Sequence, residues 1–305
     1  MHWRKLGLIY KPTGEMPWAR SHAFVPTPIL IDRETIRIFI ACWDKEQVGR
    51  IGYVDVHADN PIKIKKISTQ PVLDVGEVGH FDDNGVTATS ALREGSNILL
   101  FYSGWQLGTK VRHYIFAGVA VSANRGETFE RLSCEPVLAG SSDEPFARSG
   151  VHIAKEGNIW RLWYNAGFDW ANINGKLRAS CDIRYQESAD FLQWQPAGTV
   201  CFKPDMHNEF SLSMPHVWQT NSWHHMIYSI RSADKGYRLG YAESEDGQKW
   251  HRKDDQIGID VSSSGWDSEM ICFGKTTVTP HGTYLFYGGN NLGEAGFGVA
   301  VLEEY

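Results

Sequence analysis

The feature that most constrains the fold is a phrase that occurs several times along the chain. The segments AGVAVSANRGETF (117–129), IRYQESADFLQW (183–194) and RLGYAESEDGQKW (238–250) each combine alternating apolar residues, a serine, a polar turn and an aromatic residue. Alternation with a period of two predicts a half-buried strand, and the Asp, Asn and Gly residues predict a tight turn. We therefore expect each phrase to form a strand, a turn and a second strand.

The repeat extends over the whole chain. The apolar centres of five such phrases are 66, 66, 56 and 58 residues apart; they are Tyr53, Val119, Tyr185, Tyr241 and Val299. Two further strand-like segments precede each centre, for example IRIFIACW from Ile36. Four antiparallel strands repeated five times describe an all-β, five-bladed β-propeller. We predict one domain over residues 1–305, with residues 2–9 as the outer strand of the last blade, because the last repeat lacks a fourth strand.

Composition and charge narrow the class of protein. The chain is 42% hydrophobic and 22% charged, which allows a sizeable core. A net charge of −6 predicts no basic face, so we expect no nucleic-acid partner. No apolar run is long enough for a membrane span, and the segment MHWRKLGLIY lacks the apolar region of a signal peptide, so we expect a cytoplasmic protein.

The cysteines do not form a recognisable metal or disulfide motif. There are five, an odd number, with no CxxC pair: Cys42, Cys134, Cys181, Cys201 and Cys272. We interpret them as buried free thiols rather than a zinc site or a disulfide framework. The sequence predicts no metal and no cofactor.

Charged residues and tryptophans recur at equivalent places in the repeats. The first strand of each predicted blade lines the channel, and its entrance shares one face with the end of the second strand. The candidates at these positions are His22, Trp43, Asp83, Trp105, Arg148, Trp170, Glu209, Arg231, Asp267, Glu269 and Asn290. We expect these side chains to converge on one pocket.

Several phrases also carry a family resemblance. FDDNGV, FYSGW, YAESEDGQKW, GWDSEMICF and YGGNNLGEAGFGVA together touch all but the first part of the chain. In these phrases the chain resembles the five-bladed propeller glycosidases of the furanosidase and mannoside-phosphorylase superfamily, and more closely the glycosidase-like proteins of bacterial surface-polysaccharide gene clusters. The resemblance implies an axial pocket with carboxylates from different blades. The chain departs from the family at its first blade, where His22 replaces an acid.

Glycosidic-bond cleavage requires a protonated carboxyl and an ionised carboxylate on opposite sides of the bond. We assign Asp83, Glu209 and Glu269 as catalytic candidates, with Glu209 as the general acid and Asp83 as the base. Asp267 or Glu269 would orient the substrate. Because Asp83 and Glu209 come from non-adjacent blades, we expect an inverting geometry, with carboxyl groups about 6.5–9.5 Å apart.

The remaining candidates have substrate-binding roles in this hypothesis. Arg148 and Arg231 would bind a carboxylate or phosphate, and the tryptophans would pack against sugar rings. Each candidate also has a structural alternative. FDDNG is also a hairpin-turn signal, and Glu209 would be a loop residue. The arginines and Asp267 would form ion pairs between blades. The tryptophans would be packing residues, and His22 would be a core histidine.

Three functions remain open at this stage. The first is a glycosidase that acts on a sugar or oligosaccharide. The second is a transferase or phosphorylase that uses phosphate or an activated sugar in polysaccharide biosynthesis. The third is a propeller that binds glycans without catalysis.

Overall fold

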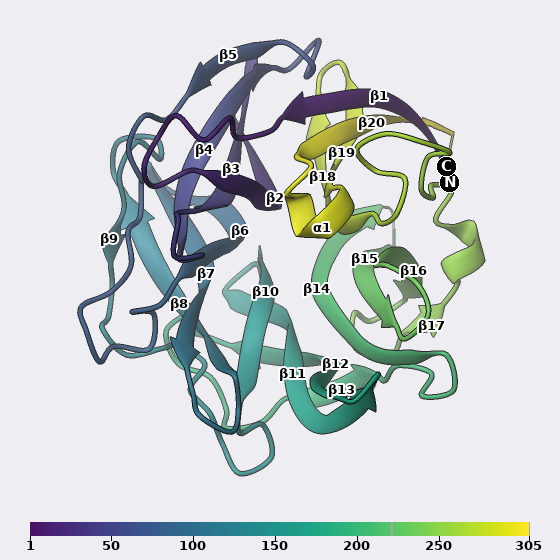
Figure 1. The fold of residues 1–305 in the computed structure, drawn as a ribbon. Helices are drawn as coiled ribbons and strands as arrows, with labels where there is room; N and C mark the ends of the chain where they lie inside the picture. Colours follow the sequence, from purple (N-terminus) through teal and green to yellow (C-terminus); the bar gives the residue numbers. More distant parts are fainter. Residues whose placement is uncertain (221, 305) are drawn as a thin grey trace.

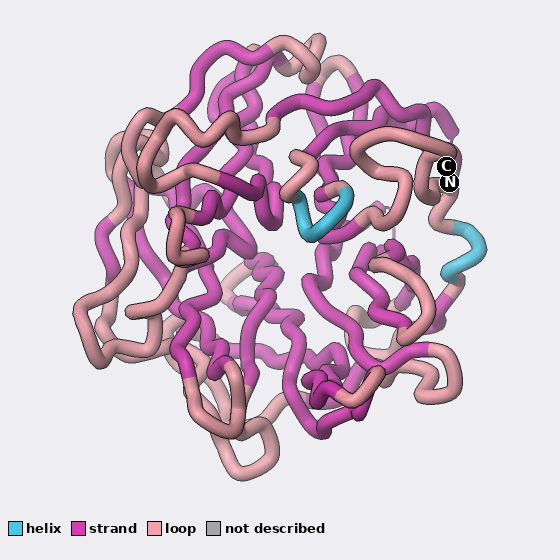
Figure 2. The backbone as a smooth tube through the Cα atoms, in the orientation of Figure 1, coloured by secondary structure: helices cyan, strands magenta, loops and turns pink. Residues whose placement is uncertain are grey.

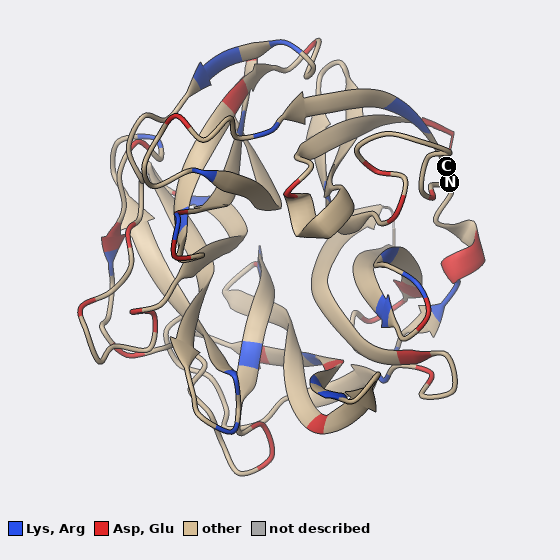
Figure 3. Cartoon of the chain, in the orientation of Figure 1, with Lys and Arg blue, Asp and Glu red and all other residues tan. Residues whose placement is uncertain are grey.

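The computed structural model describes residues 1–220 and 222–304 of the 305-residue chain. Residues 221 and 305 of the predicted single domain lie outside this described part. Most regular elements are strands. They lie around a common centre and follow one another around it in the order of the sequence (Figures 1 and 2). Basic and acidic segments are interspersed around the molecule in the view of Figure 3, which shows no continuous basic area. Because nearly all regular elements are strands, the fold is all-β, as the sequence predicts.

The strands form three four-stranded sheets and one eight-stranded sheet. For description we divide them in chain order into groups of four whose neighbouring strands are antiparallel. Group 1 contains β2 (Ser21–Asp32), β3 (Thr35–Trp43), β4 (Gly49–His57) and β5 (Ile64–Ile67). Group 2 contains β6 (Val86–Glu94), β7 (Asn97–Leu107), β8 (His113–Ser122) and β9 (Glu130–Arg131). Group 3 contains β10 (Ala147–Glu156), β11 (Ile159–Ile173), β12 (Lys176–Ser188) and β13 (Thr199–Phe202). Group 4 contains β14 (Glu209–Thr220), β15 (Trp223–Ser232), β16 (Arg238–Ser244) and β17 (His251–Arg252). Group 5 contains β18 (Cys272–Thr279), β19 (Gly282–Gly288), β20 (Phe297–Glu304) and β1 (His2–Tyr10).

Two features connect the groups beyond this simple repeat. Groups 2 and 3 belong to one eight-stranded sheet, because β8 and β10 pair in parallel through Ala147↔Ile115 and Arg148↔Phe116. The N-terminal strand β1 pairs antiparallel with β20 along its length. The expected pairing of residues 2–9 with the last strand is therefore present, and it brings the two ends of the described chain together (Figure 1).

The core lies between neighbouring strand groups. Successive residues of a strand point to opposite faces of the sheet, and here both faces are covered. On β3, Ile38 belongs to a cluster with Phe286 of group 5, whereas Phe39 belongs to a cluster with Val86 of group 2. Each fully buried side chain of this size contributes about 1.5–3 kcal/mol. Burial on both faces explains why the second strands read as continuous apolar runs.

The repeated phrase forms the turn between the third and fourth strands, as predicted. In group 4, Ser244 Oγ accepts a hydrogen bond from Gly247 N at 2.9 Å, and Asp246 Oδ1 accepts from Gln248 N at 2.8 Å. This turn also contacts the neighbouring group, because Trp163 Nε1 on β11 donates to Gly247 O at 2.7 Å. The serine and the acid are thus structural, and they fix the turn against the next sheet.

Two short helical turns complete the described elements. The 3₁₀ turn η1 (Asp254–Gln256) follows β17. The turn α1 (Asn290–Gly293) follows β19 and lies near the centre in Figures 1 and 2. Asn291 and Leu292 within it have φ angles of 57° and 60°, so this is a left-handed turn rather than a regular helix. No described helix is long and apolar enough to cross a membrane.

Candidate functional site

One pocket receives side chains from all five strand groups. Its volume is about 390 Å³. The inner strands β2, β6, β10, β14 and β18 contribute Phe24, Thr87, Ala147, Ser149, Ser211, Ser213, Met214 and Phe273. Second and third strands, loops and α1 contribute a further set, which includes Trp43, Asn84, Ser103, Trp105, Arg112, His113, Asn165, Trp170, Arg178, Cys181, Arg231, Tyr237 and Leu292. We call this site the Trp–Arg pocket.

The inner strands are irregular where they border the pocket. The antiparallel register shifts within each inner strand, for example between Ser149 and His152 on β10 and between Ser213 and His216 on β14. Non-glycine residues adopt left-handed angles here, among them Val25 at φ 52°. Bulges and strained residues of this kind are common beside functional sites, where they aim neighbouring side chains.

The irregular strands are held by polar side chains of the preceding group. Gly150 N donates to Ser103 Oγ at 3.1 Å, and Met214 N donates to Asn165 Oδ1 at 3.2 Å. Phe273 N donates likewise to a serine of β15. Ser103 and Asn165 each follow the tyrosine of a second strand, in FYSG and WYNA. The repeated phrase of the second strand therefore builds the pocket floor.

Aromatic side chains form the pocket walls. Trp43 stacks on His22, with ring centroids 3.7 Å apart, and Trp170 packs on Phe146 at 4.5 Å. Trp105 Nε1 donates to Thr87 Oγ1 at 3.2 Å. Burial lowers the pKa of His22, although Glu294 opposes this shift. The tryptophans are thus fixed by packing while part of each surface remains available to the pocket.

Small polar side chains lie between these walls. Asn165 Nδ2 donates to Ser149 Oγ at 3.0 Å, and Ser211 Oγ accepts from Cys181 N at 3.1 Å. Ser213 Oγ is buried and has no hydrogen-bond partner among the described residues. Burial raises the pKa of the Cys181 thiol to about 11, so it is a neutral group at physiological pH. A pocket with apolar walls and a few hydroxyl and amide groups suits a polar small molecule.

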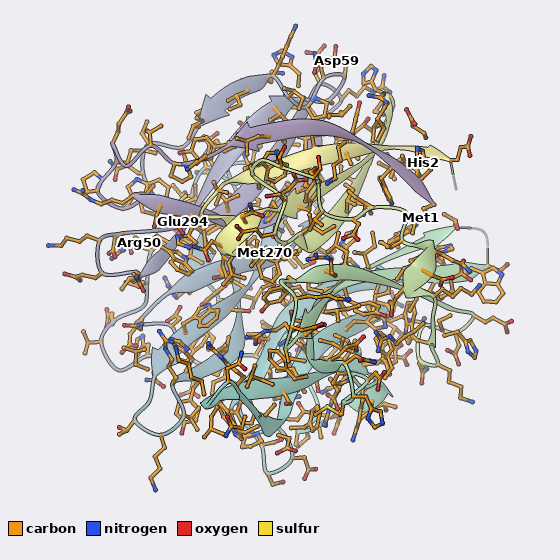
Figure 4. All side chains as sticks on the ribbon, turned by 45° about the vertical axis from the view of Figure 1, so that its right-hand side comes forward. Met1, His2, Arg50, Asp59, Met270 and Glu294 are labelled. Carbon is orange, nitrogen blue, oxygen red and sulfur yellow. The ribbon has the colours of Figure 1, made fainter. Side chains whose placement is uncertain are left out.

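The charged residues of the lining are all basic. Arg112, Arg178 and Arg231 line the pocket, and no Asp or Glu of residues 1–220 and 222–304 does so. Glu294, which is exposed, lies beside α1, and Leu292 N of this turn donates to Met270 Sδ at 3.4 Å. Figure 4 labels Met270 and Glu294 near the middle of the view. The pocket therefore has a positive lining with an acidic side chain outside it.

Four of the predicted site residues line the Trp–Arg pocket: Trp43, Trp105, Trp170 and Arg231. His22 lies behind Trp43, on which it stacks. Asp83 is next to the lining residue Asn84, and its Oδ2 accepts a hydrogen bond from Gly79 N at 2.8 Å. Three predicted tryptophans and one predicted arginine therefore line one pocket.

The structure does not bring the other candidates into the pocket lining. Glu209 forms two hydrogen bonds with Arg252, at 2.6 and 2.9 Å. Arg148 is buried, pairs with Glu144 at 2.5 Å and donates to two carbonyl groups. Glu209 and Arg148 are therefore each paired with an oppositely charged side chain of the fold.

Three further candidates belong to the loop before β18 and to α1. The buried Asp267 pairs with Lys5 at 2.6 Å, whereas the Glu269 side chain is exposed. Asn290 Oδ1 accepts hydrogen bonds from the backbone N–H groups of Glu269 and Met270, so its side chain holds this loop in place. The side chains of Asp83, Glu209 and Glu269 are not among the lining residues of the pocket that Trp105 and Arg231 line.

A second repeat pairs carboxylates with tyrosines of the second strands. In four groups, the tyrosine of the second strand donates its hydroxyl to a carboxylate that is also paired with a cation. The pairs are Tyr102 with Asp82, Tyr164 with Glu144, Tyr228 with Asp254, and Tyr287 with Asp267. The cations are Arg131, Arg148, Arg252 and Lys5. Buried charges require such partners, so this periodic pattern reflects packing.

The sequence reasoning missed several lining residues. Arg112 and Arg178 lie in the β7–β8 and β11–β12 hairpins, which no repeat marked. Ser149, Asn165 and Ser211 carry no charge and were passed over, although the small polar residues in ARSG and EFSLS recur at equivalent positions. The serine shared by the first strands β10 and β14 is the signal that could have found Ser149 and Ser211. Among the described residues, no cluster of three or more His, Cys, Asp or Glu side chains could hold a metal.

Comparisons with known proteins agree with this fold. No family model matches the chain. A putative glycosidase from Bacteroides thetaiotaomicron superposes with a TM-score of 0.73 and 16% identity, over 99% of this chain and 97% of that one. A thermostable family-43 glycoside hydrolase superposes with a TM-score of 0.68 and 13% identity, over 93% and 89% of the two chains. At these identities the likeness shows a shared fold, that of glycoside-hydrolase propellers.

A relative of closer sequence defines the family. Uncharacterized protein Rv1502 of Mycobacterium tuberculosis is 36% identical over 303 residues, which cover 99% of this chain and 100% of the relative. The matched region therefore spans nearly the whole of both chains. The chain therefore belongs to the family of Uncharacterized protein Rv1502.

Proposed function

We propose that the chain is a five-bladed propeller of one domain that binds a sugar or oligosaccharide in the Trp–Arg pocket. The single observation that carries this proposal is the convergence of Trp43, Trp105 and Trp170 with small polar side chains in one pocket. Indole faces pack against the apolar faces of sugar rings, while hydroxyl and amide groups bind the sugar hydroxyls. The glycoside-hydrolase fold of the structural neighbours supports a carbohydrate ligand.

The lining supports sugar binding, whereas the two carboxylates of the inverting hypothesis are not among the lining residues. Hydrolysis with inversion needs one carboxyl as acid and another as base around the bond. The side chains of Asp83, Glu209 and Glu269 do not line the pocket. Burial opposes the charge of Arg252, but its hydrogen bonds to Glu209 raise its pKa above the usual value. Glu209 is therefore engaged in a bidentate ion pair with Arg252 and does not line the pocket.

A panel titration tests the proposal. Neutral mono- and disaccharides are titrated into the protein, and heat or tryptophan fluorescence is recorded. We expect at least one sugar to bind and Trp170→Ala to weaken its binding about tenfold or more, since this substitution removes a stacking surface. Trp223→Ala is the matched control, because Trp223 is 40% exposed on β15 and outside the lining. Equal binding by both variants would place the sugar elsewhere, and hydrolysis of an aryl glycoside that depends on Asp83 and Glu209 would favour the inverting alternative.

A further inference from the structure

Arg231 has no carboxylate partner within the described part of the chain. It lies at the end of β15 and lines the Trp–Arg pocket. Its guanidinium carbon is 4.7 Å from the ring centroid of Phe210 and 5.3 Å from that of Tyr237. Two aromatic rings therefore orient the guanidinium through cation–π contacts, which leave its N–H donors for another group.

Arg178 and Tyr237 lie close to the same point. Both line the pocket, and neither takes part in an ion pair or side-chain hydrogen bond among the described residues. Burial raises the pKa of the Tyr237 hydroxyl, and the positive charges of Arg231 and Arg178 oppose this shift. The phenol is therefore a neutral donor at physiological pH, with two guanidinium groups near it.

The neighbouring backbone places this cluster at the junction of strand groups 3 and 4. Arg231 is opposite Ser211 in the β14–β15 register, and Ser211 Oγ accepts from Cys181 N on β12 at 3.1 Å. Arg178 is on the same strand as Cys181. Arg112 approaches from the β7–β8 hairpin, whose Val111 packs with Trp170 and Ala179. Arg231 and Arg178 therefore lie near the Tyr237 hydroxyl, and Arg112 lines the same pocket.

We infer that Arg231, Arg178 and the Tyr237 hydroxyl form an anion subsite, and that the ligand is a phosphorylated sugar whose phosphate binds there. This inference rests on the proposed sugar-binding function. Two guanidinium groups near Tyr237, with no carboxylate among the lining residues, favour a group of charge near −2 over a singly charged carboxylate. A phosphate ester carries about −1.5 to −2 charges at neutral pH and accepts hydrogen bonds on three oxygens. Arginine donors match this acceptor geometry in bidentate pairs.

The experiment compares matched ligands by calorimetric titration. The probes are mannose, mannose 1-phosphate, glucuronate and inorganic phosphate, each with the wild-type protein, Arg231→Gln, Arg231→Lys and Arg33→Gln. Arg33 is the matched control, because it is exposed in the β2–β3 turn and does not line the pocket. We expect the phosphate ester to bind about tenfold or more tighter than mannose, and Arg231→Gln to remove this difference. Arg231→Lys should recover part of it, and Arg33→Gln should leave it unchanged.

The outcomes separate this inference from the function on which it rests. If the panel sugars bind in a Trp170-dependent way but the phosphate ester binds no tighter than mannose, the anion subsite is wrong and the sugar pocket stands. If glucuronate gains affinity through Arg231 and mannose 1-phosphate does not, the anion is a carboxylate and the inference is overturned. If no neutral or phosphorylated sugar binds, both proposals fail. Competition between inorganic phosphate and mannose 1-phosphate, lost in Arg231→Gln, would support the subsite.

Discussion

Glu209 Oε1 and Oε2 lie 2.6 and 2.9 Å from the two terminal nitrogens of Arg252, in a bidentate ion pair between β14 and β17. Arg252 also binds Asp254, which accepts a hydrogen bond from the Tyr228 hydroxyl. The carboxylate at this strand entrance therefore connects the first strand of its group to the fourth. We consider it part of the fold rather than of the pocket chemistry.

Glu209→Gln should lower stability by about 1–3 kcal/mol, because it leaves a largely buried arginine with one partner fewer. The midpoint of urea unfolding measures this change. Glu135→Gln is the control, since its side chain is exposed in the loop after β9. A Glu209→Gln protein of normal stability that has lost a sugar-dependent activity would contradict the structural role.

Gly150→Ala should distort the pocket floor. Gly150 has φ +62°, and a Cβ atom there would lie 1.9 Å from Asn165 Oδ1, which binds the backbone of the next inner strand. Gly157 has nearly the same φ, +60°, with no atom within 4 Å of a built Cβ. We expect Gly157→Ala to cost about 1–2 kcal/mol for the left-handed angle alone, and Gly150→Ala to cost more and to weaken sugar binding. Equal costs in thermal unfolding would show that the Asn165 contact is unimportant.

The protein should lose stability as the pH falls from about 6.5 to 3. His152 is partly buried beside His216 and Lys275, and its removal from solvent, followed by the charge of Lys275, lowers its pKa to about 3. Burial lowers the pKa of His216 also. Because the folded-state pKa is below the unfolded value, the unfolded chain takes up the proton first, so stability is complete above pH 6.5 and is lost below it.

Urea unfolding at several pH values measures this slope. Each such histidine contributes about 1.4 kcal/mol per pH unit within the window. His152→Leu should flatten the curve, whereas His281→Gln, at an exposed turn, should not. An unchanged slope in His152→Leu would mean that the acid sensitivity comes from other groups.

Features that depend on residues near one another in the sequence could be predicted, whereas features that depend on contacts between distant residues could not. The period-two alternation and the repeat predicted the strands and the pairing of β1 with β20, because these follow from local pattern and repetition. The tryptophans of the pocket followed from the same register. The role of the recurring acids could not be predicted from the sequence. A carboxylate without a partner and one bound to a distant Arg252 or Lys5 look alike in sequence. Arg178 reaches the pocket through a long hairpin whose direction no local pattern gives.

Deletion of residues 1–10 should expose the edge of β20 and cause association. Strand β1 covers this edge along its length, and Trp3 is 5% exposed within the core between groups 4 and 5. Unpaired edges promote pairing between chains. Size-exclusion chromatography should show large species for the deletion and a normal elution for Arg4→Ala, which removes only the exposed pair with Glu303. A deleted protein that elutes like the wild type would show that β1 is dispensable for a protected edge.

The central claim is that the Trp–Arg pocket holds the sugar. A crystal structure after a soak with mannose and mannose 1-phosphate tests it most directly. The account predicts a sugar ring packed against one of Trp43, Trp105 and Trp170, with the phosphate within hydrogen-bond distance of Arg231. A sugar ordered instead between Asp83 and Glu209, away from the tryptophans, would contradict it.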